Sequence, residues 1–82
     1  MVYVDQPDKV FKGMFMCHMV ADNPTELHAM AGKLNLRREW FQYHPTHPHY
    51  DVSKAKRALA IQRGAKEVSN RELVEIIRRQ NA

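Results

Sequence analysis

Two apolar runs near the start of the chain predict strands. Residues 2–4 form a short β-branched and aromatic run that stops at residues 5–8, a stretch rich in turn formers. Residues 14–21 (MFMCHMVA) are almost wholly apolar, and an Asp-Asn-Pro sequence follows at residues 22–24. The second run is too short for an independent helix, so it predicts a buried strand.

Helical periodicity begins directly after this second run. Asn23 can accept a first-turn amide, and Pro24 presets φ at the first helical position. An apolar stripe with helical spacing follows, formed by Leu27, Met30, Ala31 and Leu34. Asn35 can adopt the left-handed conformation that ends a helix, so we predict a helix over residues 24–34.

The second half of the chain predicts shorter elements. Residues 37–43 combine arginines with three aromatic rings and predict a third strand, followed at 44–49 by a loop whose two prolines block a helix. Ser53 can cap a second helix that ends at Gly64. Residues 65–68 predict a small strand, and a capping box then opens the last helix, Ser69-Asn70-Arg71-Glu72.

The predicted order is β-β-α-β-α-β-α with short loops. Strands separated by helices favour an α/β fold, here a small and partly parallel sheet covered by about three helices. The 82 residues, 9.6 kDa, allow one compact domain over residues 1–82 and exclude a multidomain enzyme. The pattern leaves the order of the strands in the sheet open.

Composition narrows the class of protein further. Hydrophobic residues make up 44% of the chain and charged residues 27%, the balance of a soluble globular protein. The formal charge of +4 favours anionic partners. The lone Cys17, which we assign to the core, cannot close an intramolecular disulfide, so we expect a reducing, cytoplasmic location. No apolar run is long enough to span a bilayer, so we expect no membrane partner.

Polar residues at the ends of predicted elements form a candidate site. His18 and Asp22 lie on the same face of the predicted strand, and His28 lies one turn into the following helix. His49 and Asp51 arrive from the proline-containing loop. Ligands of open α/β sheets commonly bind beyond the carboxyl ends of strands, so we expect these five residues to converge there.

Two kinds of chemistry suit such a cluster, and a structural role is the alternative. Imidazoles with a carboxylate can hold a divalent metal, either Zn, Mn, Fe or Mg, through His18, Asp22, His28 and His49. The cluster can also act without metal as acid and base, and on that interpretation all five residues are catalytic. In the structural alternative, His18 is a hydrogen-bonded core residue and Asp22 assists the helix cap.

A different function is also open. Nine basic residues could form a surface for nucleic acid: Arg37, Arg38, Lys54, Lys56, Arg57, Arg63, Arg71, Arg78 and Arg79. Trp40, Phe41 and Tyr43 could stack on single-stranded bases. Basic residues on amphipathic helices are usually a solvated face, and the three rings could equally be buried.

The chain also resembles a known family. The segments that carry the resemblance are VYVD at 2–5, CHMVAD at 17–22, ELHAMA at 26–31, HYDV at 49–52 and KRALAIQRGAKEVSNRELV at 56–74. Together they are similar to domain of unknown function 4031, a family of small proteins of bacteria and phages. The resemblance implies signature positions at Asp5, His18, Asp22, Glu26, His28, His49, Tyr50, Asp51 and Arg57. Pro48 and Asn35 stand where the family pattern often has an acidic residue and a glycine.

Our first hypothesis is a small protein that binds a metal or a phosphate-bearing ligand, and that hydrolyses a nucleotide or nucleic-acid phosphate. Asp22 and Asp51 would hold metal or act as base, the histidines would be ligands or acid/base groups, and Arg57 would neutralise phosphate charge. Asp5 and Tyr50 would help to bind the ligand. The alternative is a non-catalytic phage or bacterial accessory protein that binds nucleic acid or a host protein. Either protein could form a homo-oligomer, and a phage protein would work in the bacterial cytoplasm.

Overall fold

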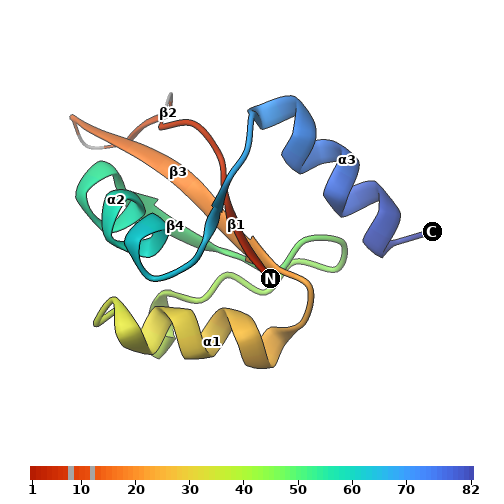
Figure 1. The fold of residues 1–82 in the computed structure, drawn as a ribbon, viewed down its shortest axis with the longest axis horizontal. Coiled ribbons are helices and arrows are strands. Elements are labelled where there is room, and N and C mark those ends of the chain that lie inside the picture. The colour runs from red at the N-terminus through yellow and green to blue at the C-terminus, as the bar shows by residue number, and fades with distance from the viewer. Residues whose placement is uncertain (8, 12) are drawn as a thin grey trace.

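Three strands precede the first helix, after which helices and strands alternate as predicted, and helices lie on both faces of one sheet (Figure 1). The structure, a computed structural model, describes residues 1–7, 9–11 and 13–82. The elements are β1 (Val2–Val4), β2 (Lys9–Phe11), β3 (Met14–Ala21), α1 (Pro24–Lys33), the 3₁₀ turn η1 (Arg38–Trp40), β4 (Tyr50–Ser53), α2 (Lys54–Gln62), β5 (Lys66–Glu67) and α3 (Asn70–Gln80). Residue 8 of the predicted turn lies outside the described residues.

The long strand β3 organises the sheet. It pairs antiparallel with β1 and β2 along one side and antiparallel with β4 along the other. On its far side, β1 pairs in parallel with β5. The predicted α/β class with a partly parallel sheet is therefore confirmed, and the register adds the strand order that the pattern left open.

The third strand was predicted in the wrong segment. Residues 37–43 form the turn η1 and a single bridge between Gln42 and His49, and the strand is β4, directly after the proline loop. Charged and aromatic residues in this segment do not alternate with period two. In β4, by contrast, Tyr50 and Val52 are buried while the residues between and after them are half-buried. The short strand β2 was not predicted.

Helix ends follow the predicted capping chemistry closely. The Asn23 side chain accepts a hydrogen bond from the backbone N–H of Glu26, as the sequence indicates. Helix α1 ends at Lys33, one residue before the predicted end, and Asn35 takes the left-handed conformation with φ of 58°. Ser53 caps α2, and Ser69 closes a capping box with Glu72 on α3. These interactions fix where each helix starts, and hence which side chains it turns toward the sheet.

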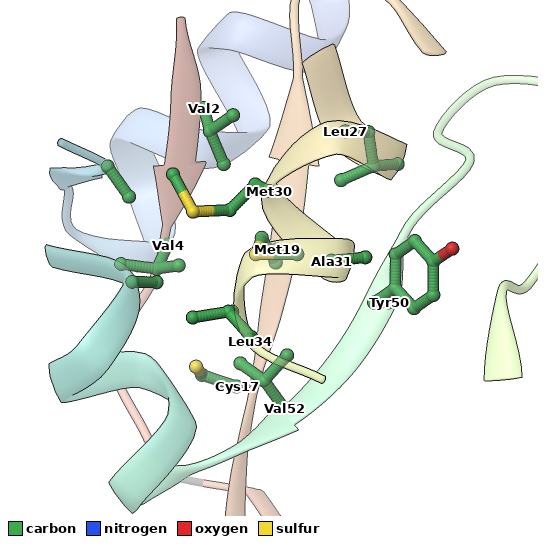
Figure 2. Close-up of a cluster of buried hydrophobic side chains, with 12 residues drawn as sticks. Val2, Val4, Cys17, Met19, Leu27, Met30, Ala31, Leu34, Tyr50 and Val52 are labelled. Atoms are coloured by element: carbon green, nitrogen blue, oxygen red, sulfur yellow. The ribbon is translucent and has the colours of Figure 1, made fainter. Parts of the chain in front are cut away.

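The main core lies between one face of the sheet and the helices α1 and α2 (Figure 2). Met19 from β3, Leu34 after α1 and Ala60 from α2 are completely buried. Fully burying a side chain the size of Met or Leu contributes about 1.5–3 kcal/mol. The i, i+3, i+4, i+7 stripe predicted from the sequence supplies the α1 side of this core.

The opposite face of the sheet is only partly covered. Helix α3 packs on it through a small cluster of three buried residues, Val20, Val68 and Leu73. The Asn81 side chain after α3 donates to the Thr46 carbonyl and so ties the helix to the proline loop. The rest of this face, along β3 and β4, carries the polar residues that form the candidate site.

Candidate metal site on the open sheet face

Three of the predicted site residues meet on this open face. His18 on β3 lies directly across from Asp51 on β4 in the antiparallel register. His49 lies two residues before Asp51, and therefore on the same face as Asp51. The ligating atoms of these three residues all lie within 4.8 Å of one another.

The distances between these atoms are close to those between the ligand atoms of a metal ion. Nε2 of His49 lies 3.5 Å from Oδ1 of Asp51, and Nε2 of His18 lies 3.9 Å from the same oxygen. Such separations are too long for good direct hydrogen bonds. They approach the roughly 3.4 Å between ligand atoms in a tetrahedral site with metal–ligand bonds of about 2.0–2.1 Å. A small contraction would bring all three atoms onto one ion.

Asp5 fixes the orientation of His18. It follows β1 directly, where the ladder with β3 is interrupted before β2. Its Oδ1 accepts the backbone N–H of His18 at 2.7 Å, and its Oδ2 lies 3.0 Å from Nδ1 of the His18 ring. An ionised carboxylate can only accept, so Nδ1 carries the proton and Nε2 presents its lone pair toward Asp51.

His49 is held in the same tautomer by its own loop. Its Nδ1 donates to the His47 carbonyl at 2.8 Å, which again leaves Nε2 with a lone pair on the Asp51 side. Two backbone hydrogen bonds with Gln42, at 2.9 and 3.1 Å, anchor His49. The Gln42 side chain donates to Oδ2 of Asp51, so that Oδ1 faces the imidazoles.

The lone pairs of these three side chains therefore converge at a half-buried position. Two imidazole nitrogens and one carboxylate oxygen face one another, and each ligand is oriented by a further hydrogen bond. The side chains are 9% exposed for His49, 20% for His18 and 39% for Asp51, so the site opens toward solvent on the Asp51 side. Two imidazole nitrogens and one carboxylate oxygen are donor atoms that suit a divalent metal ion.

His28 belongs to a different group, and its predicted convergence with the cluster is wrong. It lies on α1, which covers the opposite face of the sheet, and its Nδ1 is 2.8 Å from the Tyr50 hydroxyl. Its ring also contacts Phe41 edge-to-face. Burial, with a smaller contribution from the Arg38 charge, lowers the pKa of His28, and burial raises the pKa of Tyr50. These are the properties of a packed polar pair.

Asp22 is also separated from the cluster. It shares a strand face with His18, but four residues of extended chain place the two about 13 Å apart. Asp22 instead accepts a hydrogen bond from the Tyr3 hydroxyl at 3.0 Å and pairs with the Met1 amino group at 3.1 Å. Asp22 and His18 therefore lie on the same face of the sheet but are too far apart to belong to one site.

Arg57 and Cys17 lie behind the site. The Arg57 side chain is 11% exposed, and its guanidinium donates to the Asp5 carbonyl at 2.7 Å and pairs with Glu67. It therefore supports the residue that orients His18. Cys17 is in the main core, as predicted, and burial and the Asp5 charge raise the pKa of its thiol to about 12.

Comparison with protein families assigns this chain to a family. The family described as Protein of unknown function (DUF4031) matches residues 2–80. The chain belongs to DUF4031. No curated protein and no solved structure matches it. In the described part of the chain, no helix has the length and apolar character needed to cross a membrane.

The geometry of this DUF4031 protein adds residues that the sequence analysis did not assign to the site. Gln42 orients Asp51 through its side chain, and His47 orients His49 through its backbone carbonyl. A backbone carbonyl leaves no trace in the residue type. The Gln42–His49 bridge spans a loop with two prolines, and no periodic signal marks it.

Proposed function

We propose that this DUF4031 protein binds a divalent transition metal, with zinc as the best fit, through His18, His49 and Asp51. A metal held there would lower the pKa of a bound water, whose oxygen would form a bond to the phosphorus of a nucleotide or nucleic-acid ester while the P–O ester bond breaks and the alcohol leaves. The proposal rests on one observation: three ligating atoms lie within 4.8 Å of one another on an open sheet face.

The donor set supports a transition metal over magnesium or calcium. Two imidazoles and one carboxylate suit zinc, manganese or iron, whereas magnesium and calcium prefer oxygen ligands. Catalytic zinc sites often use three protein ligands and keep a further position for water or substrate. The solvent-exposed side of Asp51 provides the room for that position.

The hydrogen bonds around the ligands support the proposal independently. Metal-binding histidines usually donate their second ring N–H to a carboxylate or a carbonyl. His18 does so to Asp5 and His49 does so to the His47 carbonyl. In the described chain Asp5 and His49 are the buried polar residues, which fits a built site more closely than a chance surface cluster.

The hydrolytic step follows from what a metal supplies at such an open position. A zinc ion lowers the pKa of its bound water to about 7, which provides a nucleophile at neutral pH. Asp51 and the two histidines would hold the ion, and Asp5 and Gln42 would keep those ligands oriented. The chain's net charge of +4 favours an anionic substrate.

Metal binding is tested by calorimetric titration of chelator-treated protein with zinc and with manganese. We expect about one zinc per chain for the wild type, and on the order of 100-fold weaker binding or more for His49→Ala and for Asp51→Asn. His44→Ala is the matched control, because His44 is exposed and lies outside the cluster. Absence of binding heat in the wild type, or unchanged affinity in a folded Asp51→Asn protein, overturns the metal site.

Hydrolysis is tested separately on the zinc-loaded protein. A chromogenic phosphodiester and the matching monoester serve as probes, with Asp51→Asn as the inactive reference. We expect turnover that is lost on chelation and regained with zinc. Stoichiometric zinc without turnover of either probe overturns the hydrolytic part and leaves the metal site in place.

A further inference from the structure

Two large aromatic side chains are exposed on the segment that precedes His49 and Asp51 of the proposed metal site. Trp40 is 51% exposed and Tyr43 is 81% exposed, although both are large rings that proteins usually cover at least in part. They lie on residues 37–43, the segment that contains the turn η1. Their Cα atoms, three residues apart, are at most about 11 Å from each other.

Positive charge accompanies these rings. The Arg37 guanidinium lies over the Trp40 ring, 5.7 Å from its centroid. Arg38 is exposed, and its charge reaches both His28 and Tyr50 beneath the segment. Glu39 offsets part of this charge, because it pairs with Arg37 at 3.1 Å.

The backbone of the segment is held in place from below. Phe41 points inward, with its ring centroid 4.7 Å from that of His28 and 5.5 Å from that of Tyr50. Gln42 is fixed by its two backbone hydrogen bonds to His49. Two anchored residues, Phe41 and Gln42, thus lie between the two exposed rings, and a ligand that stacks on the rings would not have to order a mobile loop.

We infer that residues 37–43 form a binding platform for single-stranded nucleic acid. Bases stack on Trp40 and Tyr43, and Arg37 and Arg38 contact the phosphates. Planar aromatic faces beside guanidinium groups suit a ligand with planar rings and negative charge, which single-stranded nucleic acid combines. The +4 net charge of the chain favours the same partner.

The platform does not depend on the metal. Its two rings and two arginines are distinct from the metal ligands, although Gln42 connects the two regions. Binding is therefore measured on metal-free protein, where its failure cannot be confused with failure of the metal site.

Trp40 is the single tryptophan of the chain and so reports on its own surroundings. We expect its fluorescence to be quenched when oligothymidine or oligouridine is added, with fluorescence anisotropy of labelled oligonucleotide giving the affinity. Tyr43→Ala and Trp40→Ala should each weaken binding by roughly 5- to 150-fold, the range measured for loss of one stacked base. Val74→Ala, which removes an exposed apolar side chain on α3, is the matched control and should bind normally.

Charge variants test the second half of the inference. Arg37→Gln should reduce the slope of log affinity against log salt by about 1, as expected when one phosphate contact is lost. Glu39→Gln should strengthen binding, since it releases Arg37 from its ion pair. Duplex DNA should compete poorly, because its bases are not free to stack.

Two results would overturn the inference. One is an unchanged Trp40 spectrum with every single-stranded oligonucleotide, which would leave the exposed rings to a protein partner. The other is oligonucleotide binding that Tyr43→Ala and Val74→Ala weaken equally.

Discussion

The two faces of the central strands β3 and β4 have opposite characters. One face turns Cys17, Met19 and Val52 into a core that α1 and α2 cover. The other turns His18 and Asp51 toward solvent, and α3 covers that face only near Val20. The same two strands thus provide both faces, with residues alternating between them.

This difference shows how one pair of strands separates an apolar core from a polar cluster. Burying a polar group without a partner costs free energy, so the polar cluster is tolerated where the sheet stays half open and each ligand has a hydrogen-bond partner. The dry face supplies the packing. Substitutions on one face should therefore change folding, and substitutions on the other should change binding.

The largest expected effect lies on the dry face. Leu34 is fully buried between α1 and the sheet, so Leu34→Ala should lower the free energy of unfolding by about 2–5 kcal/mol. Leu73→Ala on the α3 side should cost less, since Leu73 belongs to a cluster of only three buried residues. Urea denaturation measures both. If Leu73→Ala lowered the free energy of unfolding more than Leu34→Ala, the face under α3 would contribute more to stability than the face under α1 and α2, which would contradict this comparison.

A smaller effect is expected from Asp5→Asn, which leaves the shape of the site unchanged. The new amide can accept from the His18 backbone N–H through its oxygen, but its NH₂ group then faces Nδ1 of the ring. His18 must shift its proton to Nε2 and loses the lone pair that faces Asp51. Zinc affinity should fall by about 10- to 100-fold, with less loss of stability than Leu34→Ala causes.

Calorimetry and urea denaturation of the same Asp5→Asn preparation separate these two effects. Glu75→Gln, at an exposed position on α3, serves as a comparison for the loss of one negative charge. Equal zinc affinities for Asp5→Asn and the wild type would mean that the tautomer of His18 is not controlled by Asp5.

The smallest expected effect concerns His28, whose pKa is lowered by burial and then by the Arg38 charge. The unfolded chain therefore takes up a proton near the ordinary histidine value of 6.5, while the folded protein takes it up only at lower pH. The contribution of His28 to the free energy of unfolding is therefore complete above pH 6.5. It decreases as the pH falls from 6.5 through the lower pKa of the folded state. In His28→Gln, the free energy of unfolding measured by urea denaturation should decrease less between neutral and mildly acidic pH than it does in the wild type. An identical pH profile would contradict this assignment.

Local signals predicted much of the fold. The cap at Asn23, the stripe of α1 and the capping box at Ser69 each depend on residues within a few positions of one another, and each is present in the structure. The strand β4 was missed because four residues between a proline loop and a helix cap carry little periodic signal. The pairing of residues far apart along the chain, which sets strand order, is not encoded in any local pattern.

The candidate site was predicted only in part, for a geometric reason. Strand alternation correctly gave the face of His18, but it could not give the distance that separates it from Asp22 along the strand. His28 was included because its helix begins beside the strand, and that helix covers the other face. Asp5 was named from the family resemblance alone, since its contact with His18 crosses the interrupted ladder.

That interruption has a consequence for observing the site. At Asp5 a side-chain carboxylate, in place of a backbone carbonyl, receives the His18 amide proton, and the same carboxylate holds the His18 ring. One chemical group thus connects the peptide backbone of the central strand to the electronic state of the imidazole. The amide resonance of His18 is a built-in spectroscopic reporter, and its chemical shift should register whatever charge resides between the two histidines.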